Sequence, residues 1–498
     1  MLSCIRHYIT SICVVILCFA QSSVLALSEG KVLDQIKQSI VTINSRMTYS
    51  AFYPLGNMSG TGFIVDCKKG WIVTNSHVVG GHSVGNYNIV FYNGHSIYGD
   101  VIYCDTWQDY AIIQINPSEI PEGTAPIKLA KDLAKHYQKV YVISNSDGLA
   151  FSLHEGVVSD SYGIHGVPPR ASYVITLGAK GGSSGSPVLN EKHEAIGVVH
   201  GGNETSSSVF ALYSQYVEHA LEALGRNAEA PSVPVRQHIG VICKSMCLDK
   251  AVLHRSLPRQ VVTDYIKAFP DARNSALAVE SVLAGSPAVG KLFAGDIIVS
   301  VNNVKVANNL YLFDKAMNEA KGVASVVLYR DGKQITQEVE VYDVEKYKVK
   351  KLLSYNDAIF ANADELASYY TGVPLGYLSV RHVRDGSSLS SIYPFYKEEG
   401  YRLQILSIAN HPINTIDDLI NLLKDNKVPK NTTFLVKNYL PYWNYNSVTA
   451  HQTLLHDVIL DSANGTLMKV DNLGKWSEEI INSSFMQQES PAVSENAR

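Results

Sequence analysis

Three segments of the sequence carry side chains that could together perform acyl transfer. His77 follows the apolar run Trp71–Thr74, Asp109 precedes the run "YAIIQI", and Ser184 lies in the stretch "KGGSSGSPVLN". A serine hydroxyl becomes a nucleophile when an imidazole accepts its proton and a carboxylate orients that imidazole. The three residues occur in the order His, Asp, Ser, each at a strand edge of one β-rich segment. We therefore predict that His77 is the general base, Asp109 the orienting acid and Ser184 the nucleophile.

The glycines around Ser184 are typical of an oxyanion hole. Gly182 could turn its N–H inward beside the N–H of Ser184, and two such donors stabilise a tetrahedral oxyanion. Each piece also has an ordinary structural reading, because a glycine-serine loop is often a flexible connection and an Asp before a strand is often a turn residue. The competing residues in the same segment are Asp105 for the acid, and His82, His95 and His200 for the base, with His200 expected in a loop that lines the pocket.

Composition places these residues in a β-rich globular chain. With 498 residues and 46% hydrophobic residues, the chain is long enough for about three domains of roughly 100–200 residues each. The net charge of -4 shows no basic bias and speaks against a nucleic-acid partner. Twenty-nine tyrosines and frequent Val and Ile favour strands. Serine chemistry of this kind needs no cofactor, and Cys243 and Cys247 lack nearby histidines at zinc-finger spacing, so we expect no metal site.

The first 26 residues have the layout of a secretory signal. An Arg lies near the start, an apolar run covers Ile12–Ala20, and the first acid is Glu29. That run is shorter than the about 20 residues of a membrane span. We predict export with cleavage after Ala26, with an uncleaved membrane anchor as the alternative. Export permits disulfides, but spacing does not assign a pairing to the remaining cysteines, which are Cys67, Cys104, Cys243 and Cys247.

The rest of the chain divides into segments by pattern. Residues 27–228 contain short apolar strands separated by turns, and the Pro-containing "GRNAEAPSVPVRQ" then reads as a linker. Residues 299–313 align with residues 406–420, each with an apolar strand, a polar turn and the start of an amphipathic helix. We expect two copies of one small α/β module, over residues 236–345 and 346–470, with a helix at Asn309–Ala320 in the first. The polar residues 471–498 are expected to be disordered.

Four motifs resemble the HtrA/Deg family of chymotrypsin-like serine proteases. They are "GTGFIVD" (60–66), "TNSHVV" (74–79), "DYAIIQI" (109–115) and "GGSSGSP" (181–187). The resemblance implies a mainly β fold with two six-stranded barrels and an active site in the cleft between them. It assigns the base, acid and nucleophile to His77, Asp109 and Ser184, and the oxyanion-hole donors to Gly182 and Ser184. The family commonly has Asn-Ser-Gly-Gly-Pro at the nucleophile, whereas this chain has Ser-Ser-Gly-Ser-Pro.

The same resemblance gives meaning to the repeated module. Residues 293–317 look like part of a PDZ domain, in which a peptide adds as a strand to a sheet edge beside "HIGVI", here Ile239, Gly240 and Val241. The second copy looks like a degenerate PDZ domain, and a peptide-binding role and a spacer or assembly role both remain open for it. The strand "VFAL" would line the substrate pocket through Phe210, Ala211 and Leu212, which implies a small or medium aliphatic P1 residue. Residues 159–172 lie where the family has its sensor loop, and homo-oligomers, trimers or multiples of trimers, are implied.

The resemblance implies an exported, ATP-independent serine endopeptidase of protein quality control and stress response. Its substrates would be misfolded or unfolded proteins, its location the periplasm in a bacterial host, and chaperone activity could accompany cleavage. C-terminal peptides would bind the first PDZ module. The alternative is a catalytically silent, PDZ-containing chaperone or scaffold that binds peptides on a protease-like platform. Labelling by a fluorophosphonate probe, lost on Ser184→Ala, separates the two.

Overall fold

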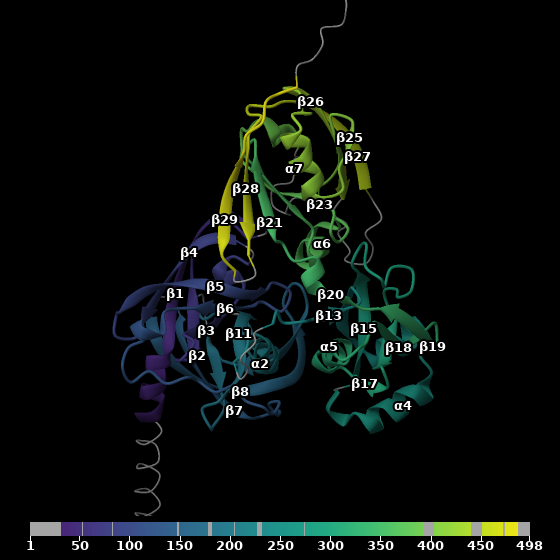
Figure 1. The fold of residues 1–498 in the computed structure, drawn as a ribbon. Coiled ribbons are helices and arrows are strands. Elements are labelled where there is room, and N and C mark those ends of the chain that lie inside the picture. Colours follow the sequence, from purple (N-terminus) through teal and green to yellow (C-terminus); the bar gives the residue numbers. More distant parts are fainter. Residues whose placement is uncertain are drawn as a thin grey trace, which may run out of the picture.

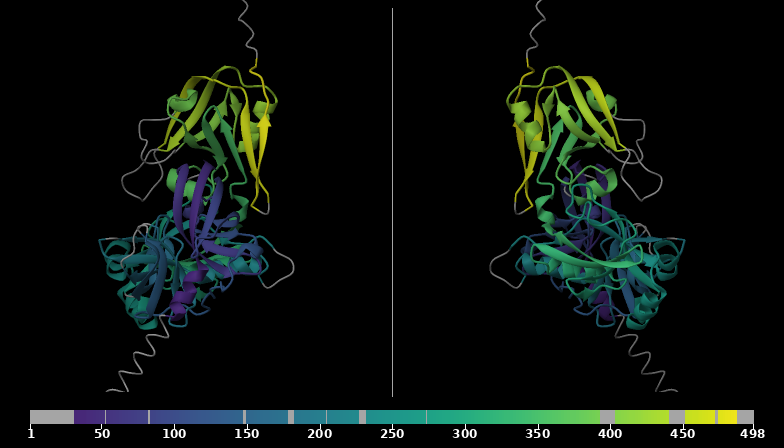
Figure 2. Two further views of the ribbon diagram at one scale, coloured as in Figure 1. Left: turned by 90° about the vertical axis from the view of Figure 1, so that its left-hand side faces the viewer. Right: turned by 90° about the vertical axis from the view of Figure 1, so that its right-hand side faces the viewer.

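The computed structural model describes most of the chain and shows three parts. The described residues are 31–51, 53–81, 83–146, 149–177, 182–203, 205–226, 232–272, 274–392, 403–439, 451–471 and 474–486. A two-barrel region comes first, followed by a middle module (residues 237–343) and a C-terminal module (residues 351–481). Figures 1 and 2 show the C-terminal module above the barrels, and Figure 1 shows the middle module beside them. The predicted signal segment, residues 1–26, lies outside the described residues.

The first barrel closes on itself in the order β1-β2-β3-β6-β5-β4. Its strands are β1 (Ile40–Ser50), β2 (Gly56–Asp66), β3 (Trp71–Thr74), β4 (Ser83–Phe91), β5 (Ser96–Asp105) and β6 (Tyr110–Gln114). The second barrel closes in the order β10-β11-β12-β9-β8-β7. Its strands are β7 (Lys139–Ser146), β8 (Leu149–His165), β9 (Arg170–Thr176), β10 (Pro187–Leu189), β11 (Ala195–Asn203) and β12 (Ser208–Tyr213), followed by helix α2 (Ser214–Ala223). The predicted pair of six-stranded barrels is confirmed.

The strands that join the barrels are buried on both faces, which explains their unbroken apolar sequences. Alternate residues of a strand point to opposite faces. In β2, Ile64 packs inside the first barrel, whereas Phe63 and Val65 pack into a core that continues into the second barrel. In β3, Ile72 and Val73 divide in the same way. Residues at the ends of β2 and β3 therefore lie at the junction of the two barrels.

The middle module is a sheet in the order β14-β15-β16-β18-β19, with β17 paired to β16. Its elements are β14 (Val241–Cys247), α3 (Leu248–Arg255), α4 (Arg259–Ala268), β15 (Ser275–Val282), β16 (Ile297–Val301), β17 (Val304–Lys305), α5 (Leu310–Asn318), β18 (Val323–Arg330) and β19 (Lys333–Glu340). The short strands β13 (Gln237–His238) and β20 (Tyr342–Asp343) pair with each other. Helix α5 matches the helix expected at Asn309–Ala320.

The C-terminal module repeats this order and then extends it. Strands β22-β23-β24-β26-β27, with β25 paired to β24, correspond to β14-β15-β16-β18-β19 with β17, and α7 corresponds to α5. Three further strands, β21, β28 and β29, continue the sheet beyond β22. The elements are β21 (Lys351–Tyr355), β22 (Ala358–Asn362), α6 (Glu365–Thr371), β23 (Leu378–Val383), β24 (Leu403–Ile408), β25 (His411–Pro412), α7 (Ile416–Lys424), β26 (Asn431–Tyr439), β27 (His451–Ile459), β28 (Gly465–Val470) and β29 (Trp476–Ile481).

The expectation of disorder from residue 471 is wrong for β29. This strand pairs with β28 over its whole length, and Ile481 is buried in the core of the C-terminal module. Its polar side chains face outward at the sheet edge, so low hydrophobicity did not prevent pairing. Residues 487–498 lie outside the described residues.

The three parts contact one another through side chains. Tyr311 of α5 packs against Tyr213 and Tyr216 at ring-centroid distances of 5.4 and 5.3 Å. Tyr49 of β1 packs against the C-terminal module, beside Leu352. Among the described residues, no helix combines the length and apolarity that crossing a bilayer requires. The four cysteines Cys67, Cys104, Cys243 and Cys247 are free thiols.

Candidate active site

His77 and Asp109 are brought together because they follow and precede neighbouring strands. β3 ends at Thr74, which pairs with Ala111 of β6, so the residues after β3 lie beside those before β6. His77 begins a 3₁₀ helix, η2 (His77–Val79). Its Nδ1 lies 2.9 Å from Asp109 Oδ2 and 3.1 Å from Oδ1, and its backbone N–H donates to Oδ1 at 3.0 Å. The carboxylate thus holds the Nδ1–H tautomer and leaves Nε2 free to accept a proton.

The electrostatics of the pair suit a base and its orienting acid. Burial alone would raise the pKa of Asp109, but the charge and hydrogen bond of His77, with the charge of Arg170, lower it to about 2. Burial alone would lower the pKa of His77, but the charge of Asp109 and its hydrogen bond outweigh burial and raise that pKa. Asp109 is therefore ionised at neutral pH, as is required of a carboxylate that stabilises an imidazolium.

Asp109, and not its rival Asp105, faces the imidazole. Asp105 Oδ1 accepts from the backbone N–H groups of Trp107 and Gln108 at 3.0 and 2.9 Å, and Oδ2 pairs with Arg236. Asp105 therefore shapes the loop that carries Asp109. Of the rival histidines, His95 lies in the turn after β4, stacked on Phe91, and residue 82 is outside the described residues.

Ser184 lies between the two barrels, tied to each through its backbone. Its carbonyl oxygen accepts from the Thr61 N–H of β2 at 2.8 Å, and the next residue, Gly185, donates its N–H to Val199 of β11 at 2.8 Å. Gly60 shows how close this loop comes to η2. A Cβ on Gly60 would lie 2.6 Å from Val78 Cγ2 and 3.1 Å from the Ser184 carbonyl oxygen. The nucleophile loop and the helix that begins at His77 thus meet across one glycine.

The hydroxyl of Ser184 makes no hydrogen bond with His77 in the part of the chain that the structure describes. Such contacts are often long in unliganded enzymes and tighten when substrate binds. Gly182 has a φ of +93°, and its carbonyl accepts from Thr61 Oγ1 at 2.8 Å. The Gly182 N–H belongs to a peptide shared with residue 181, which is outside the described residues. The oxyanion hole of Gly182 and Ser184 therefore stays a prediction.

The predicted pocket residues differ in what they can present to a substrate. Ala211 and Leu212 are fully buried in the barrel core, whereas Phe210 is half-buried. The Phe210 ring stacks on His165, with centroids 4.2 Å apart and planes 3° from parallel. His200, predicted to line the pocket, lies 6.4 Å from the Phe210 ring. A second serine–histidine pair, Ser172 Oγ with His200 Nε2 at 2.8 Å, is closed to substrate because Ser172 is fully buried.

The predicted peptide-binding residues form a rigid turn before β14. Gly240 has a φ of +84°, and a Cβ there would lie 2.1 Å from the Cβ of Ser286. The carbonyls of Ile239 and Gly240 accept from Ala288 and Leu283. Val241 is buried at the start of β14. Within the described residues, β14 pairs with β15 on one side and with no strand on the other.

Two residues near Asp109 were not predicted as part of the site. Arg170, at the start of β9, is buried, donates its Nε–H to the carbonyl of Trp107, and lowers the pKa of both Asp109 and His77. The phenol of Tyr53 has a raised pKa because of burial first and the charge of Asp109 second. The burial of Arg170 could not be predicted from its neighbours in the sequence, "PPRAS", because residues far away in the chain surround its side chain.

Comparison with known proteins agrees with this geometry. The family model "Trypsin-like peptidase domain" matches residues 60–198. An uncharacterised protein of Rickettsia prowazekii is 37% identical over 188 residues, which are 36% of this chain and 97% of that protein. Protease Do-like 7 of Arabidopsis thaliana is 27% identical over 394 residues, 74% of this chain. The chain spans only about a third of that plant relative, with 34% covered.

A solved structure, the HtrA-type protease AlgW with a tripeptide, matches 62% of this chain and 95% of its own at 16% identity and a TM-score of 0.45. The trypsin-like match, residues 60–198, contains His77, Asp109 and Ser184. Trypsin-like peptidases are serine proteases whose two barrels flank the reacting serine. By its trypsin-like peptidase match, its Do-like relative and its two six-stranded barrels, this chain belongs to the HtrA family of serine proteases.

Proposed function

We propose that this chain is an ATP-independent endopeptidase that cleaves unfolded proteins, with His77, Asp109 and Ser184 as its triad. The observation that carries the proposal is the 2.9 Å contact between His77 Nδ1 and the Asp109 carboxylate, beside a glycine loop that holds Ser184 between the barrels. An imidazole fixed in this tautomer presents Nε2 to a serine hydroxyl, which is the arrangement that activates serine for attack.

The geometry supports the following sequence of steps. Ser184 Oγ attacks the scissile carbonyl carbon while His77 Nε2 accepts the hydroxyl proton. The tetrahedral intermediate collapses as His77 gives that proton to the leaving amine, which leaves an ester on Ser184. His77 then deprotonates a water molecule that attacks the ester, and the carboxylic acid and the serine hydroxyl are regenerated. Gly182 and Ser184 would supply the N–H donors for the oxyanion.

The two modules support a division of labour in this proposal. In the middle module, β14 has no strand partner on one side among the described residues, and an extended peptide terminus would add there, near Ile239, Gly240 and Val241. In the C-terminal module the equivalent strand, β22, is already paired with β21, through Leu353 with Phe360 and Tyr355 with Ala358. The C-terminal module therefore acts as a spacer or assembly element. The proposal also includes export, with a periplasmic location in a bacterial host, and a role in stress response. It further includes chaperone activity and a trimeric assembly.

The test uses casein cleavage and fluorophosphonate labelling of the mature chain. Ser184→Ala should abolish both. Ser186→Ala is the matched control, because the buried Ser186 hydroxyl has no hydrogen-bond partner among the described residues, and this variant should keep both activities. An activating peptide and mild heat are included in every assay. Absence of labelling under all conditions would favour the silent scaffold. Loss of labelling in Ser186→Ala, with labelling kept in Ser184→Ala, would assign the nucleophile to Ser186.

The ends of the casein fragments test the substrate pocket. Small or medium aliphatic P1 residues are expected, because Phe210, which is half-buried and uncharged, is the predicted pocket residue that can reach a substrate. Ala211 and Leu212 lie in the barrel core behind it. A predominance of Lys or Arg at P1 would contradict this assignment of the pocket.

A further inference from the structure

Trp107, two residues before Asp109, is buried outside its own barrel. It belongs to the loop of residues 106–109 between β5 and β6, yet its indole packs with Ile242 and Leu283 of the middle module and Leu375 of the C-terminal module. The side chain is 6% exposed. Figure 1 shows β13, β20 and α6 gathered where the barrels and the two modules meet. The loop that carries Asp109 is thus anchored by Trp107, which is buried where the two modules meet.

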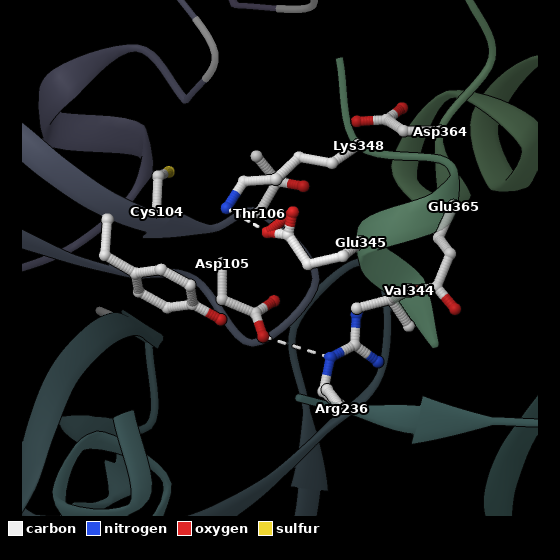
Figure 3. Close-up of a pocket in the computed structure, with 10 residues that line it drawn as sticks. Cys104, Asp105, Thr106, Arg236, Val344, Glu345, Lys348, Asp364 and Glu365 are labelled. Atoms are coloured by element: carbon white, nitrogen blue, oxygen red, sulfur yellow. Dashed lines mark hydrogen bonds and ion pairs between the residues drawn. The ribbon is translucent and has the colours of Figure 1, made fainter. Parts of the chain in front are cut away.

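A buried ionic relay holds the same loop at Asp105. Arg236, in the linker before β13, donates Nε–H to Asp105 Oδ2 at 3.0 Å and pairs through a second nitrogen with Glu365 of α6. Glu365 also accepts from His238 Nδ1 and from the Tyr342 hydroxyl, each at 2.7 Å. Figure 3 shows Arg236 reaching between Asp105 and the helix of Glu365. Asp105, Arg236 and Glu365 line a cavity of about 30 Å³, which has room for about one water.

Two further hydrogen bonds fix the intervening residues. Gln108 Nε2 donates to Asp314 Oδ2 of α5 at 3.2 Å, and the same oxygen accepts from Tyr216 at 2.6 Å. The carbonyl of Trp107 accepts from Arg170. Successive residues of the loop are therefore bound by the linker, by both modules and by the second barrel.

The conformation of Asp109 explains what this anchoring does. Asp109 has a φ of +61°, which is costly for a residue with a side chain and persists only where the surroundings enforce it. Inside the first barrel, the Asn75 side chain holds the Asp109 carbonyl at 2.8 Å. The backbone N–H groups of Trp107 and Gln108 are held by Asp105 of the same barrel, but the Trp107 and Gln108 side chains and the Trp107 carbonyl are held by groups outside it. Displacing the modules would free the loop to relax and would turn the carboxylate away from His77.

We propose that Trp107 and the Asp105–Arg236–Glu365 relay are positioning elements for Asp109, so that the two modules complete the active site from outside the protease barrels. The inference rests on the proposed function for its kinetic consequence, but the His77–Asp109 geometry can be observed without turnover. A module that shifts when it binds a peptide or a second chain would change the orientation of the imidazole. Substrate contacts would remain unchanged.

The test compares Arg236→Gln and Trp107→Ala with the full-length chain, using Arg226→Gln as the matched control. Arg226 also bridges a helix and the first barrel, through Glu218 and the Val65 carbonyl, but does not touch the loop of Asp109. Two readouts are taken: kcat and KM on a fluorogenic peptide, and the low-field proton resonance of the His77 Nδ1–H shared with Asp109. Far-UV circular dichroism checks that each variant is folded.

We expect Arg236→Gln and Trp107→Ala to lower kcat by about 100-fold, the cost of misplacing a catalytic group by about 1 Å, while KM stays nearly constant. The low-field resonance should disappear in both variants and persist in Arg226→Gln. Resonance and kcat unchanged in both variants would overturn the proposal, and so would an equal loss in Arg226→Gln. If both variants fail to fold, Trp107→Phe decides, since a weakened resonance supports anchoring and an unchanged one refutes it. A wild-type chain with the resonance but no peptidase activity would refute the proposed function alone.

Discussion

The two halves of the candidate site are built differently. The acid–base half lies wholly in the first barrel, where neighbouring strand ends place His77 against Asp109 and three hydrogen bonds join the two residues. The nucleophile half depends on a glycine loop whose backbone is bonded to both barrels, and Ser184 itself is not bonded to His77 within the described residues. The first half is therefore assembled before substrate arrives, whereas the second depends on how the barrels meet. Substitutions in the two halves should therefore lower activity through different structural changes.

The largest effect is expected in the preassembled half. Asp109→Asn should lower kcat by about 10,000-fold, because the amide no longer holds the Nδ1–H tautomer or stabilises the imidazolium. Asp105→Asn is the comparison, and it should cost far less because Asp105 does not touch His77. Steady-state kinetics on a peptide substrate measure both. Near-normal turnover in Asp109→Asn together with an inactive Asp105→Asn would exchange their roles.

The next largest effect is expected where the glycine loop approaches β2 of the first barrel. Gly185 has a φ of +89°, and a Cβ there would lie 1.9 Å from the Thr61 carbonyl oxygen. Gly185→Ala should therefore displace Ser184 and lower kcat by about 100-fold or more. The His77–Asp109 resonance should persist, because the atoms that clash belong to Thr61 and Thr74, and the hydrogen bonds between His77 and Asp109 involve neither residue.

Gly201→Ala in β11 is the control for that variant, since the nearest atom to its Cβ, on Phe210, lies 3.9 Å away. If Gly185→Ala is as active as Gly201→Ala, the position of Ser184 does not depend on the close approach of Gly185 to Thr61.

A smaller effect is expected for the side chain that ties the glycine loop to β2. Thr61 Oγ1 donates to the Gly182 carbonyl at 2.8 Å and accepts from the Asn145 N–H at 3.1 Å. Thr61→Val removes both bonds at nearly constant volume and should lower kcat by about tenfold, equivalent to about 1.4 kcal/mol. Thr48→Val, which removes an exposed bond to Val84, should leave kcat unchanged. Equal kcat values for the two variants would show that the glycine loop around Gly182 keeps its conformation without the Thr61 hydrogen bonds.

The smallest effect concerns the pH profile. The raised pKa of His77 keeps the imidazole protonated above its ordinary value of 6.5, so the acid limb of kcat/KM should lie above that pH. In Asp109→Asn the residual activity should show an acid limb below 6.5, because burial and the charge of Arg170 then act alone and both lower the pKa. His200, whose pKa is lowered to about 3 first by burial, is neutral across this range. An unshifted limb in Asp109→Asn would show that another group titrates.

The same pair links folding stability to pH. The depressed pKa of Asp109, about 2 against 3.8, contributes stability that is present above about pH 4 and is lost as the pH falls toward 2. The raised pKa of His77 contributes stability that is complete below 6.5 and is lost as the pH rises through the folded-state pKa.

Strand ends were well predicted from local patterns, and long-range packing was not. The runs before His77 and after Asp109 are apolar and β-branched, so their strand character and the placement of both residues at strand ends follow from propensity. The sequence favoured Asp109 over Asp105 but did not exclude Asp105, because both flank the same turn and only the path of the loop separates them. Arg170 and Tyr53 were missed because their burial depends on loops far away in the sequence.

The modules show the same limit. The repeat of strand, turn and helix was visible in the sequence, and it matches the shared order of the two sheets. Pairing of β21 with β22 was not visible, because an edge strand and a covered strand have similar composition. Disorder from residue 471 was wrong for the same reason, since pairing of β29 with β28 depends on a partner that composition does not reveal.

By itself, the sequence determined the strand-rich first segment, the repeated module and the three residue types of serine chemistry, because strand propensity, turn residues and motif order are local properties. The two barrels were implied by the family resemblance. Only the tertiary structure excluded Asp105 as the residue that faces His77. Only it showed that β22 has a second strand partner while β14 has none among the described residues, and that Trp107 lies between the modules. Each of these depends on which distant surfaces meet, and the free energy of such contacts is set by shape and charge that no single segment contains.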